Sequence, residues 1–519
     1  MLVKTFSSAV FGVDARTITV EVNTGGPITS HSKVGYHMVG LPDNAVREGF
    51  QRISAAIKNV GKRMPNVQLV INLAPADVRK EGSAFDLPIA LGILAATGQI
   101  PEEQLEYLVI LGELSLDGGI RPIKGSLPMA IQARKEKYRG IILPKANARE
   151  AAIVNDLDVY GVDNLEEAVR LLEGTSDLSP LRVDTREIFH EQQDHYLVDF
   201  SDVKGQENIK RALELTAAGG HNAILIGPPG AGKTMLARRM STILPPLTLH
   251  EALETTKIHS VAGVLPSDSG LITTRPFRSP HHTISDVALV GGGSNPHPGE
   301  ISLAHNGVLF LDELPEFKRT VLEVMRQPME ERRVTIARAR FSVDYPASFM
   351  LIASMNPCPC GYYNHPEKEC VCAPGVVKRY LTKISGPLLD RIDLHVEVTP
   401  VSYDQLASME RPAESSEDIR QRVMRAREVQ AARFKDMPEI YCNAQMPSRM
   451  VQQVCQINQA GTTLLKTAMQ RLQLSARAYD RILKVARTAA DLAGSEEIRV
   501  EHLAEAIQYR SLDREGWAG

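Results

Sequence analysis

Long apolar runs, cysteines and aromatic residues are all scarce in this sequence of 519 residues. No uninterrupted run of about 18 apolar residues occurs, which argues against a membrane-spanning helix. Six cysteines are too few for a disulfide-stabilised secreted scaffold. The first residues lack the charged start, apolar stretch and cleavage site of a signal peptide. We therefore expect a cytoplasmic protein without a membrane partner.

The chain also lacks an excess of charge of either sign. Its 59 Lys and Arg residues nearly balance its 62 Asp and Glu residues, and the formal net charge is −3. This balance excludes a whole-chain electrostatic attraction to nucleic acid, so any DNA contact must come from a local basic patch. The hydrophobic fraction of 43% supplies enough apolar material for folded cores.

The length predicts about three domains, and changes in sequence pattern indicate where they lie. Strand-like and helix-like runs alternate in the N-terminal third, which predicts an α+β unit. Further on, a strand–loop–helix pattern predicts an α/β domain, and the last part of the chain has only helical periodicity. The expected parts are an α+β domain over 1–175, a polar linker over 176–200, an α/β domain over 201–400, an Arg-rich connecting helix over 401–440 and a helical domain over 441–519.

The strongest motif is a glycine-rich loop between an apolar run and a helical segment. This context and the sequence GPPGAGKT are those of a P-loop, whose backbone N–H groups bind phosphate oxygens. Lys233 is expected to reach the β and γ phosphates of ATP, and Thr234 to ligate Mg²⁺. A Gly-Pro turn that matches by chance is the alternative. The expected nucleotide-binding residues are Gly227, Pro228, Pro229, Gly230, Ala231, Gly232, Lys233 and Thr234.

Two further motifs support a nucleotide site. The apolar run from Gly307 ends in Asp312 and Glu313. We expect Asp312 to hold Mg²⁺ and Glu313 to polarise the attacking water, although a solvated acidic turn would look the same. Asn356 follows another apolar run and can contact the γ-phosphate or the water. Alone, it would more often be a turn residue.

Four of the six cysteines lie within fifteen residues, as two C-x-C pairs. Four thiolates can enclose a tetrahedral Zn²⁺ ion, so we expect a zinc site. C-x-C is less diagnostic than C-x-x-C, and reduced structural thiols or a redox pair remain alternatives. The expected ligands are Cys358, Cys360, Cys370 and Cys372.

Three basic segments are candidates for DNA contact. Residues 255–300 look like an insert, and residues 326–340 hold five Arg and two Glu and lead into an alternating, hairpin-like run. Alternation places Arg338 and Arg340 on one face. A third segment is the Arg-rich helix of the connecting region. Each element is equally compatible with a solvated face or a subunit contact. The side chains are Arg275, Phe277, Arg278, His281 and His282 in the insert, and Arg420, Arg422, Arg425 and Arg427 in the helix.

These motifs together resemble the magnesium-chelatase-like branch of the AAA+ ATPases. The resemblance includes the P-loop, Asp312-Glu313, Asn356 and the segment 385–393, and nearly the whole chain is similar to the ComM/YifB family of bacterial proteins. It implies a P-loop AAA+ core with a C-terminal helical lid. It also implies that Arg391 reaches the γ-phosphate of a neighbouring subunit, although a helix-end Arg paired with an Asp would look alike. Arg477 is the implied lid sensor, with Arg481 as the competing candidate.

The N-terminal domain resembles that of Lon proteases, which use a Ser–Lys dyad. The nucleophile position falls on Ala84 and the lysine position near Leu127, while Ser83 and Lys124 are each out of register. We therefore expect a scaffold that is not proteolytic.

The family resemblance implies a hexameric, ATP- and Mg²⁺-dependent DNA motor. In related helicases two hairpins line the pore of the ring, and the implied activity is helicase-driven branch migration during recombination or natural transformation. Two other functions compete with this one. The first is a magnesium-chelatase motor subunit, against which the Lon-like domain argues. The second is a peptide-remodelling machine, against which the missing dyad argues.

Overall fold

The computed structural model describes two compact units that interleave along the sequence. The first comprises Met1–Gln192 and Thr248–Thr273, and the second comprises Gln193–Leu247 and Thr274–Gly519. None of the described helices is long and apolar enough to cross a membrane. The described residues are 1–27, 36–191, 196–266, 270–293, 296–338, 341–363, 365, 367–373, 375–400, 414–437, 439–472, 474–510 and 512.

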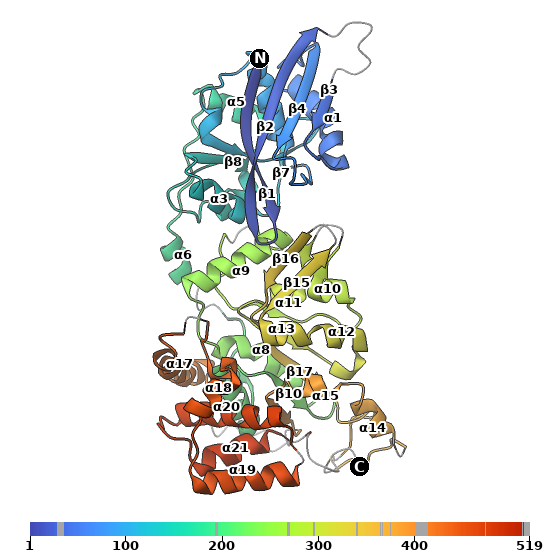
Figure 1. Ribbon diagram of the computed structural model, residues 1–519, viewed down its shortest axis with the longest axis vertical. Helices are drawn as coiled ribbons and strands as arrows, with labels where there is room; N and C mark the ends of the chain where they lie inside the picture. The colour runs from blue at the N-terminus through green and yellow to red at the C-terminus, as the bar shows by residue number, and fades with distance from the viewer. Residues whose placement is uncertain are drawn as a thin grey trace. The chain divides into compact units, whose positions relative to one another are not determined.

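The first unit contains a mixed sheet of seven strands in the order β3-β4-β2-β1-β5-β8-β9. β1 and β2 form a long antiparallel pair, visible as the two long blue arrows in Figure 1. β1 pairs in parallel with β5 on its other side, and β5, β8 and β9 continue in parallel. The strands are β1 Leu2–Phe11, β2 Asp14–Pro27, β3 Tyr36–Val39, β4 Val67–Ala74, β5 Leu108–Ile110, β8 Gly140–Pro144 and β9 Asp158–Val162, with a small hairpin of β6 Glu113–Leu114 and β7 Ile120–Arg121.

Helices α1, α2 and α5 of the first unit share one buried core with this sheet. Every residue of α2 is buried, because its residues after Asp86 are apolar on all sides and Asp86 pairs with Arg52 at 2.7 Å. The Asp43 side chain caps α1 by accepting from the Val46 N–H at 2.8 Å. The helices are α1 Asn44–Asn59, α2 Asp86–Ala96, α3 Ser126–Lys135, α4 Lys145–Ala151, α5 Leu165–Leu172, α6 Thr185–Glu191 and α9 Leu249–Ala262. The alternation predicted for 1–175 is therefore present as an α+β fold.

Two segments belong to the first unit although the sequence suggested otherwise. Within the expected linker 176–200, α6 packs on the unit, because Phe189 is buried and the Thr185 hydroxyl donates to the Ile153 carbonyl. Within the expected α/β domain 201–400, α9 packs against α3. The Gly125 N–H donates to the Ser260 carbonyl at 3.0 Å, and Lys257 pairs with Asp14 at 2.7 Å.

The second unit is built on a parallel sheet in the order β11-β14-β17-β10-β18. The central strands are buried at every residue, as expected where helices cover both faces. Outside this sheet lie the small pair β12 Gly291–Gly292 and β13 His297–Pro298 and the hairpin of β15 Arg333–Arg338 and β16 Phe341–Pro346. The sheet strands are β10 Ala223–Ile226, β11 Phe277–Arg278, β14 Val308–Leu311, β17 Met350–Met355 and β18 Leu394–Glu397.

Helices at the end of the chain share one core with this sheet. Ile482 and Val485 of α20 belong to the same buried cluster as Leu225 of β10. The expected lid is therefore helical, as predicted, and it packs as part of the second unit. The helices are α7 Glu207–Gly219, α8 Lys233–Ile243, α10 Asp286–Val290, α11 Glu300–Leu303, α12 Arg319–Val324, α13 Arg326–Glu331, α14 Val376–Leu381, α15 Gly386–Leu389, α17 Ser416–Arg433, α18 Ser448–Val454, α19 Gln459–Arg471, α20 Ala476–Leu492 and α21 Val500–Gln508.

Candidate nucleotide-binding site

The P-loop lies between the carboxyl end of β10 and the first turn of α8. Gly230 and Gly232 have φ of 80° and 84°, a left-handed conformation that glycine adopts without strain. A Cβ atom at Gly227 would lie 2.3 Å from the Val398 carbonyl oxygen, so only glycine fits there. These glycines let the loop turn tightly into the N-terminus of α8, where free N–H groups favour an anion.

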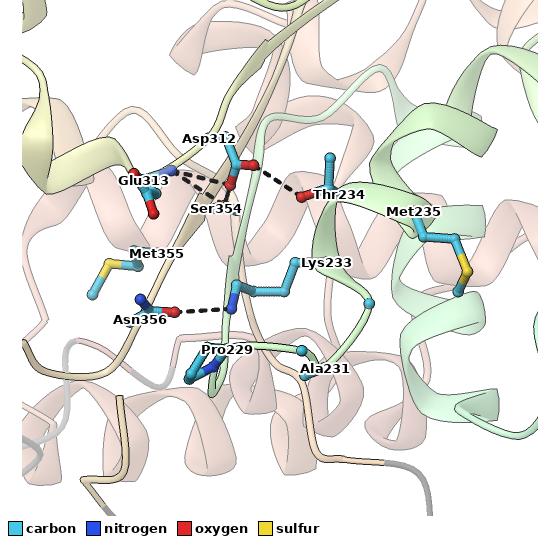
Figure 2. Close-up of a pocket in the computed structure, with 12 residues that line it drawn as sticks. Pro229, Ala231, Lys233, Thr234, Met235, Asp312, Glu313, Ser354, Met355 and Asn356 are labelled. Carbon is cyan, nitrogen blue, oxygen red and sulfur yellow. Dashed lines mark hydrogen bonds between the residues drawn. The ribbon is translucent and has the colours of Figure 1, made fainter. Parts of the chain in front are cut away.

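Lys233 is the first residue of α8, and its side chain is largely buried against this loop. Its Nζ donates to the carbonyl oxygens of Gly227 at 2.7 Å and Pro228 at 2.9 Å, and to Asn356 Oδ1 at 3.1 Å. Figure 2 shows the Lys233 and Asn356 side chains pointing toward each other. Burial lowers the pKa of Lys233, and the nearby Asp312 and Glu313 oppose this shift. Because the Lys233 ammonium is poorly solvated, it would interact strongly with a negatively charged oxygen that entered the site.

Asp312 directly follows β14 and is hydrogen-bonded both to the P-loop and to β17. Its Oδ2 accepts from the Thr234 hydroxyl at 2.9 Å, and its Oδ1 accepts from the Ser354 hydroxyl. Hydroxyl and carboxylate oxygens are the ligands that Mg²⁺ prefers. Ser354 was not predicted as a site residue. Its place two residues before Asn356, on the strand next to β14, is the signal that would have identified it.

Glu313 has a strained backbone and an accessible carboxylate. Its φ is 55°, which is uncommon for a residue with a side chain, and strain of this kind is concentrated at functional sites. Its N–H donates to Asp312 Oδ1 at 3.1 Å and lies 3.4 Å from the Ser354 hydroxyl. Its side chain is 56% exposed, and Oε2 lies 3.7 Å from His282 Nδ1. The carboxylate can thus reach a water, and His282, expected at DNA, is beside it.

A cavity of about 430 Å³ contains these groups. Its size lies within the usual range for a small-molecule site. Backbone N–H groups, one ammonium, one hydroxyl–carboxylate pair and one amide line it, and this donor set fits a triphosphate with Mg²⁺. The described lining residues are Pro229, Gly230, Ala231, Gly232, Lys233, Thr234, Met235, Asp312, Glu313, Ser354, Met355 and Asn356.

Arg391, the expected trans-acting residue, is held within its own chain. Its side chain is only 7% exposed, and its guanidinium lies 2.7 Å from Glu330 Oε1 and donates to the Pro387 carbonyl at 2.6 Å. The partner is thus Glu330 rather than Asp390 or Asp393, the two aspartates near Arg391 in the sequence. In this arrangement Arg391 does not project into solvent, so its role at a neighbouring site stays a prediction.

The two candidate lid arginines differ in what surrounds them. Arg477 is 60% exposed and lies 4.0 Å from Asp390, at the outer limit of an ion pair. Arg481 pairs with the fully buried Asp393 at 2.8 Å. Because Arg481 is paired with a buried carboxylate, Arg477 is the better candidate for contact with a nucleotide.

The four clustered cysteines lie together, as expected for a metal site. Their sulfur atoms are all within 4.8 Å of one another. Cys358 lies 3.3 Å from Cys360 and 3.7 Å from Cys370, and Cys360 lies 3.5 Å from Cys370. These separations are too long for disulfides and near the roughly 3.8 Å between sulfurs in a tetrahedral zinc–thiolate site.

Two arginines expected at DNA have partners within the fold, and their contact with DNA stays a prediction. Arg275 donates to the carbonyl oxygens of Pro245 at 2.5 Å and Asn306 at 2.7 Å. Arg278 forms a two-pronged pair with Glu300 at 2.6 and 2.7 Å. Both arginines satisfy groups within the second unit, because the insert folds back on the sheet.

The other DNA candidates lie on the β15–β16 hairpin and on α17. β15 and β16 form the predicted hairpin, but the Arg338 side chain and all of Arg340 lie outside the described residues. In α17, Arg422 pairs with Glu214 and Glu414 at 2.5 Å each, and Arg427 donates to the Ala217 carbonyl. The Arg-rich helix thus uses two of its cations for packing.

In the N-terminal unit the partner of the candidate serine is a carboxylate. Ser83 donates to the Glu113 carboxylate, and Ala84 is its neighbour in the chain. Leu127 is fully buried, and the Lys124 side chain lies against Gly263 at the end of α9.

Comparison with known proteins assigns the chain to a family. "Magnesium chelatase, subunit ChlI" matches residues 199–406, "Subunit ChlI of Mg-chelatase" matches 20–147, and "Magnesium chelatase, subunit ChlI C-terminal" matches 413–510. The second unit is therefore of the magnesium-chelatase-like AAA+ type. Similarity to Lon protease 2 of Bacillus subtilis is partial, with 30% identity over 28% of this chain and 27% of that protein.

Two relatives match almost from end to end. The chain is 42% identical to competence protein ComM of Haemophilus influenzae, over 98% of this chain and 97% of that protein. It is 44% identical to YifB of Escherichia coli, over 98% of this chain and 96% of that protein. Identity at this level over nearly the whole length shows that the chain belongs to the ComM/YifB family.

Proposed function

We propose that this protein is an ATP-hydrolysing AAA+ motor that acts on DNA as a homo-hexamer. The observation that carries the ATPase part is the convergence of Lys233, Thr234, Asp312, Glu313 and Asn356 on one cavity. Each lies at the end of a strand or the start of a helix, so the sheet fixes their positions.

Each of these residues would have a separate role in phosphoryl transfer. Lys233 would hold the β and γ phosphates, and Thr234 and Asp312 would hold Mg²⁺, which neutralises phosphate charge when bound. Glu313 would take a proton from the attacking water, and Asn356 would orient that water or the γ-phosphate. Arg391 of a neighbouring subunit and Arg477 of the lid would add positive charge. This division requires a subunit interface at the pocket, which is the reason for proposing a ring.

Action on DNA rests on family membership and on the hairpin. A relative of nearly equal length is named a competence protein, and DNA uptake requires DNA processing. The β15–β16 hairpin follows the Asp312-Glu313 strand, where related helicases place a pore hairpin, and Arg338 and Arg340 are its candidate phosphate contacts. We therefore propose helicase and branch-migration activity in recombination or transformation.

A magnesium-chelatase-type motor is the second candidate. All three matching family descriptions name a subunit of that enzyme, so an ATPase that drives a protein or porphyrin-chelatase partner has specific support. The Lon-like N-terminal domain argues against it, because true chelatase motors are expected to begin near the AAA+ module.

We also propose that the four clustered cysteines bind Zn²⁺. Their sulfur separations match a tetrahedral tetrathiolate site, and the Tyr363 N–H points at the Cys358 sulfur at 3.3 Å. Four thiolates this close need a cation to offset their mutual repulsion.

A comparison of stimulators tests the proposed function. ATP turnover would be measured with branched DNA, with a porphyrin-chelatase partner and with unfolded protein. We expect branched DNA to raise turnover most, and the stimulated rate to fall steeply with salt because phosphate contacts release counterions. Stimulation by the chelatase partner alone would support the second candidate, and stimulation by unfolded protein alone would contradict both.

A further inference from the structure

The four-cysteine cluster belongs to a loop that leaves the nucleotide pocket and returns to it. β17 ends at Met355, and Asn356 of the pocket follows at once. Only Pro357 separates Asn356 from Cys358, the fully buried first cysteine. After Cys372 the chain enters α14, whose buried Tyr380 side chain interacts with the Asn356 backbone. The cluster thus joins two segments that both reach Asn356.

A second contact ties the same loop to the P-loop. The Gly361 N–H donates to the Cys358 carbonyl at 3.0 Å, which closes a turn around the first two cysteines. Gly361 has φ of 86°, and a Cβ atom there would lie 2.5 Å from Pro229 Cδ. Since Pro229 lines the cavity, the turn that carries Cys358 and Cys360 rests directly on the phosphate-binding loop.

These contacts surround Lys233 from two sides. Asn356 receives a hydrogen bond from Lys233, and Pro229 is part of the loop whose carbonyl groups hold the same ammonium. Without a metal, nothing covalent holds Cys358 and Cys360 to Cys370 and Cys372. Bound metal would close this long loop, and closing a loop removes freedom from the segments at its ends.

We propose that metal binding by Cys358, Cys360, Cys370 and Cys372 fixes Asn356 and Pro229 in the nucleotide pocket, so that the metal is a structural cofactor of the ATPase itself. This inference rests on the proposed ATPase function and extends it. Asn356 is the group that acts on the nucleotide, while Gly361 and Tyr380 are positioning residues. Displacing a reacting group by about 1 Å can cost up to roughly 10²-fold in rate.

Three substitutions separate this role from a general need for folding. Gly361→Ala keeps all four cysteines but pushes a methyl group into Pro229, and Tyr380→Phe removes only the hydroxyl that Asn356 meets. Gly375→Ala is the matched control, because Gly375 lies in the same loop with φ of 77° and no atom within 4 Å of its added Cβ. Cys370→Ser removes one ligand.

Zinc per chain, thermal unfolding and kcat would be measured for each full-length protein. We expect about one zinc per chain in the wild type, Gly361→Ala, Tyr380→Phe and Gly375→Ala. We expect kcat to fall about tenfold or more in Gly361→Ala and several-fold in Tyr380→Phe, and to stay within about twofold in Gly375→Ala. Cys370→Ser should lose both zinc and turnover. Unchanged kcat in both Gly361→Ala and Tyr380→Phe, or full turnover in zinc-free Cys370→Ser, would overturn the proposal.

A second readout does not depend on ATP turnover. If the metal and the nucleotide stabilise the same arrangement, each must raise affinity for the other by the same factor. A non-hydrolysable ATP analogue with Mg²⁺ should therefore lower the zinc dissociation constant about fivefold. A competing chelator would then remove a smaller fraction of the bound Zn²⁺ at equilibrium. Gly361→Ala should weaken this coupling. An unaffected zinc dissociation constant would refute the inference, whereas absent turnover in a wild-type protein that shows the coupling would count only against the ATPase proposal.

Discussion

At the scale of single residues, the candidate site combines a hydrogen-bonded cluster with one strained position. Lys233 donates to Asn356 at 3.1 Å, and Thr234 donates to Asp312 at 2.9 Å. Glu313 stands apart, with a left-handed backbone and a carboxylate that is 56% exposed. An accessible carboxylate beside a fixed cluster is what a water-activating residue requires.

The first prediction concerns Glu313. Glu313→Gln should bind ATP with nearly normal affinity but lower kcat by about 10²–10⁴-fold, because only the proton acceptor is removed. Nucleotide affinity and steady-state turnover check this directly. Glu316→Gln is the matched control, since Glu316 lies three residues away and pairs with Lys383 on the surface. Equal turnover in the two variants would remove Glu313 from its role.

The second prediction concerns Arg391 and its internal partner. Glu330 holds the guanidinium within the chain, so a role at the neighbouring site requires that this pair opens. Arg391→Ala should bind ATP but hydrolyse it poorly, whereas Glu330→Gln should raise basal turnover by freeing the arginine. Mixing Arg391→Ala with Lys233→Ala subunits should restore partial activity, because some interfaces then pair an intact P-loop with an intact arginine. Absence of recovery, with subunit exchange verified, would contradict a trans role.

At the scale of elements, strands and loops that depend on neighbouring residues could be predicted from the sequence, but contacts between residues far apart in the chain could not. β10, β14 and β17 could be predicted because each is a short apolar run that ends in a motif. The P-loop and the Asp312-Glu313 pair followed from their immediate context. The pairing of Arg278 with Glu300, 22 residues away, could not be predicted, so the internal partner of this DNA candidate appears only in the structure. Likewise, helical periodicity in α9 does not indicate which unit the helix covers.

The third prediction concerns the element pair β18 and α20. Asp393 is fully buried, pairs with Arg481 at 2.8 Å and accepts from the Asn222 N–H at 2.9 Å. Burial alone would raise the pKa of Asp393, but Arg481, His221 and Asn222 outweigh it and hold the pKa well below its usual range. A carboxylate with a lowered folded-state pKa stabilises the fold above the unfolded value of about 3.9, and the contribution is lost as the pH falls further.

We therefore expect the free energy of unfolding to decrease below about pH 4, and less steeply in Asp393→Asn than in the wild type. At pH 7 this variant should lose about 3–5 kcal/mol, because it leaves the Arg481 charge buried and unpaired. Chemical denaturation across pH measures both effects. Glu497→Gln, on the surface of the same unit, serves as the control. A parallel pH dependence in Asp393→Asn and the wild type would show that the pair does not contribute.

At the scale of the whole molecule, the chain passes from the first unit to the second, returns as Thr248–Thr273 and leaves again. The returning segment supplies α9, which covers α3 and brings Lys257 to Asp14 and the Ser260 carbonyl to the Gly125 N–H. A boundary drawn near residue 175 or 200 would therefore separate the first unit from one of its own helices.

The fourth prediction concerns fragments. Residues 1–191 alone should have a lower melting temperature and faster proteolysis than the same fragment joined by a short flexible linker to residues 248–273. The reason is that α3 loses apolar cover and hydrogen-bond partners without α9. Thermal unfolding and limited proteolysis measure the difference. As a control, the added segment would carry Lys257→Ala, which removes only an exposed ion pair and should cost less than about 1 kcal/mol. Equal stability of the two fragments would show that α9 is dispensable to the first unit.

The return of α9 also dictates an order of events during protein synthesis. A ribosome completes β10, the P-loop and α8 before it reaches Thr248. The first unit therefore cannot reach its final form until Thr273 has left the exit tunnel, although its sheet strands were made much earlier. During that interval the nascent chain carries an uncovered α3 surface and a completed β10 strand whose sheet neighbours β17 and β18 have not yet been made. Exposed apolar surface of this kind invites aggregation and chaperone binding. The interleaved chain thereby delays completion of the N-terminal unit until part of the ATPase has been made, and links the maturation of the two.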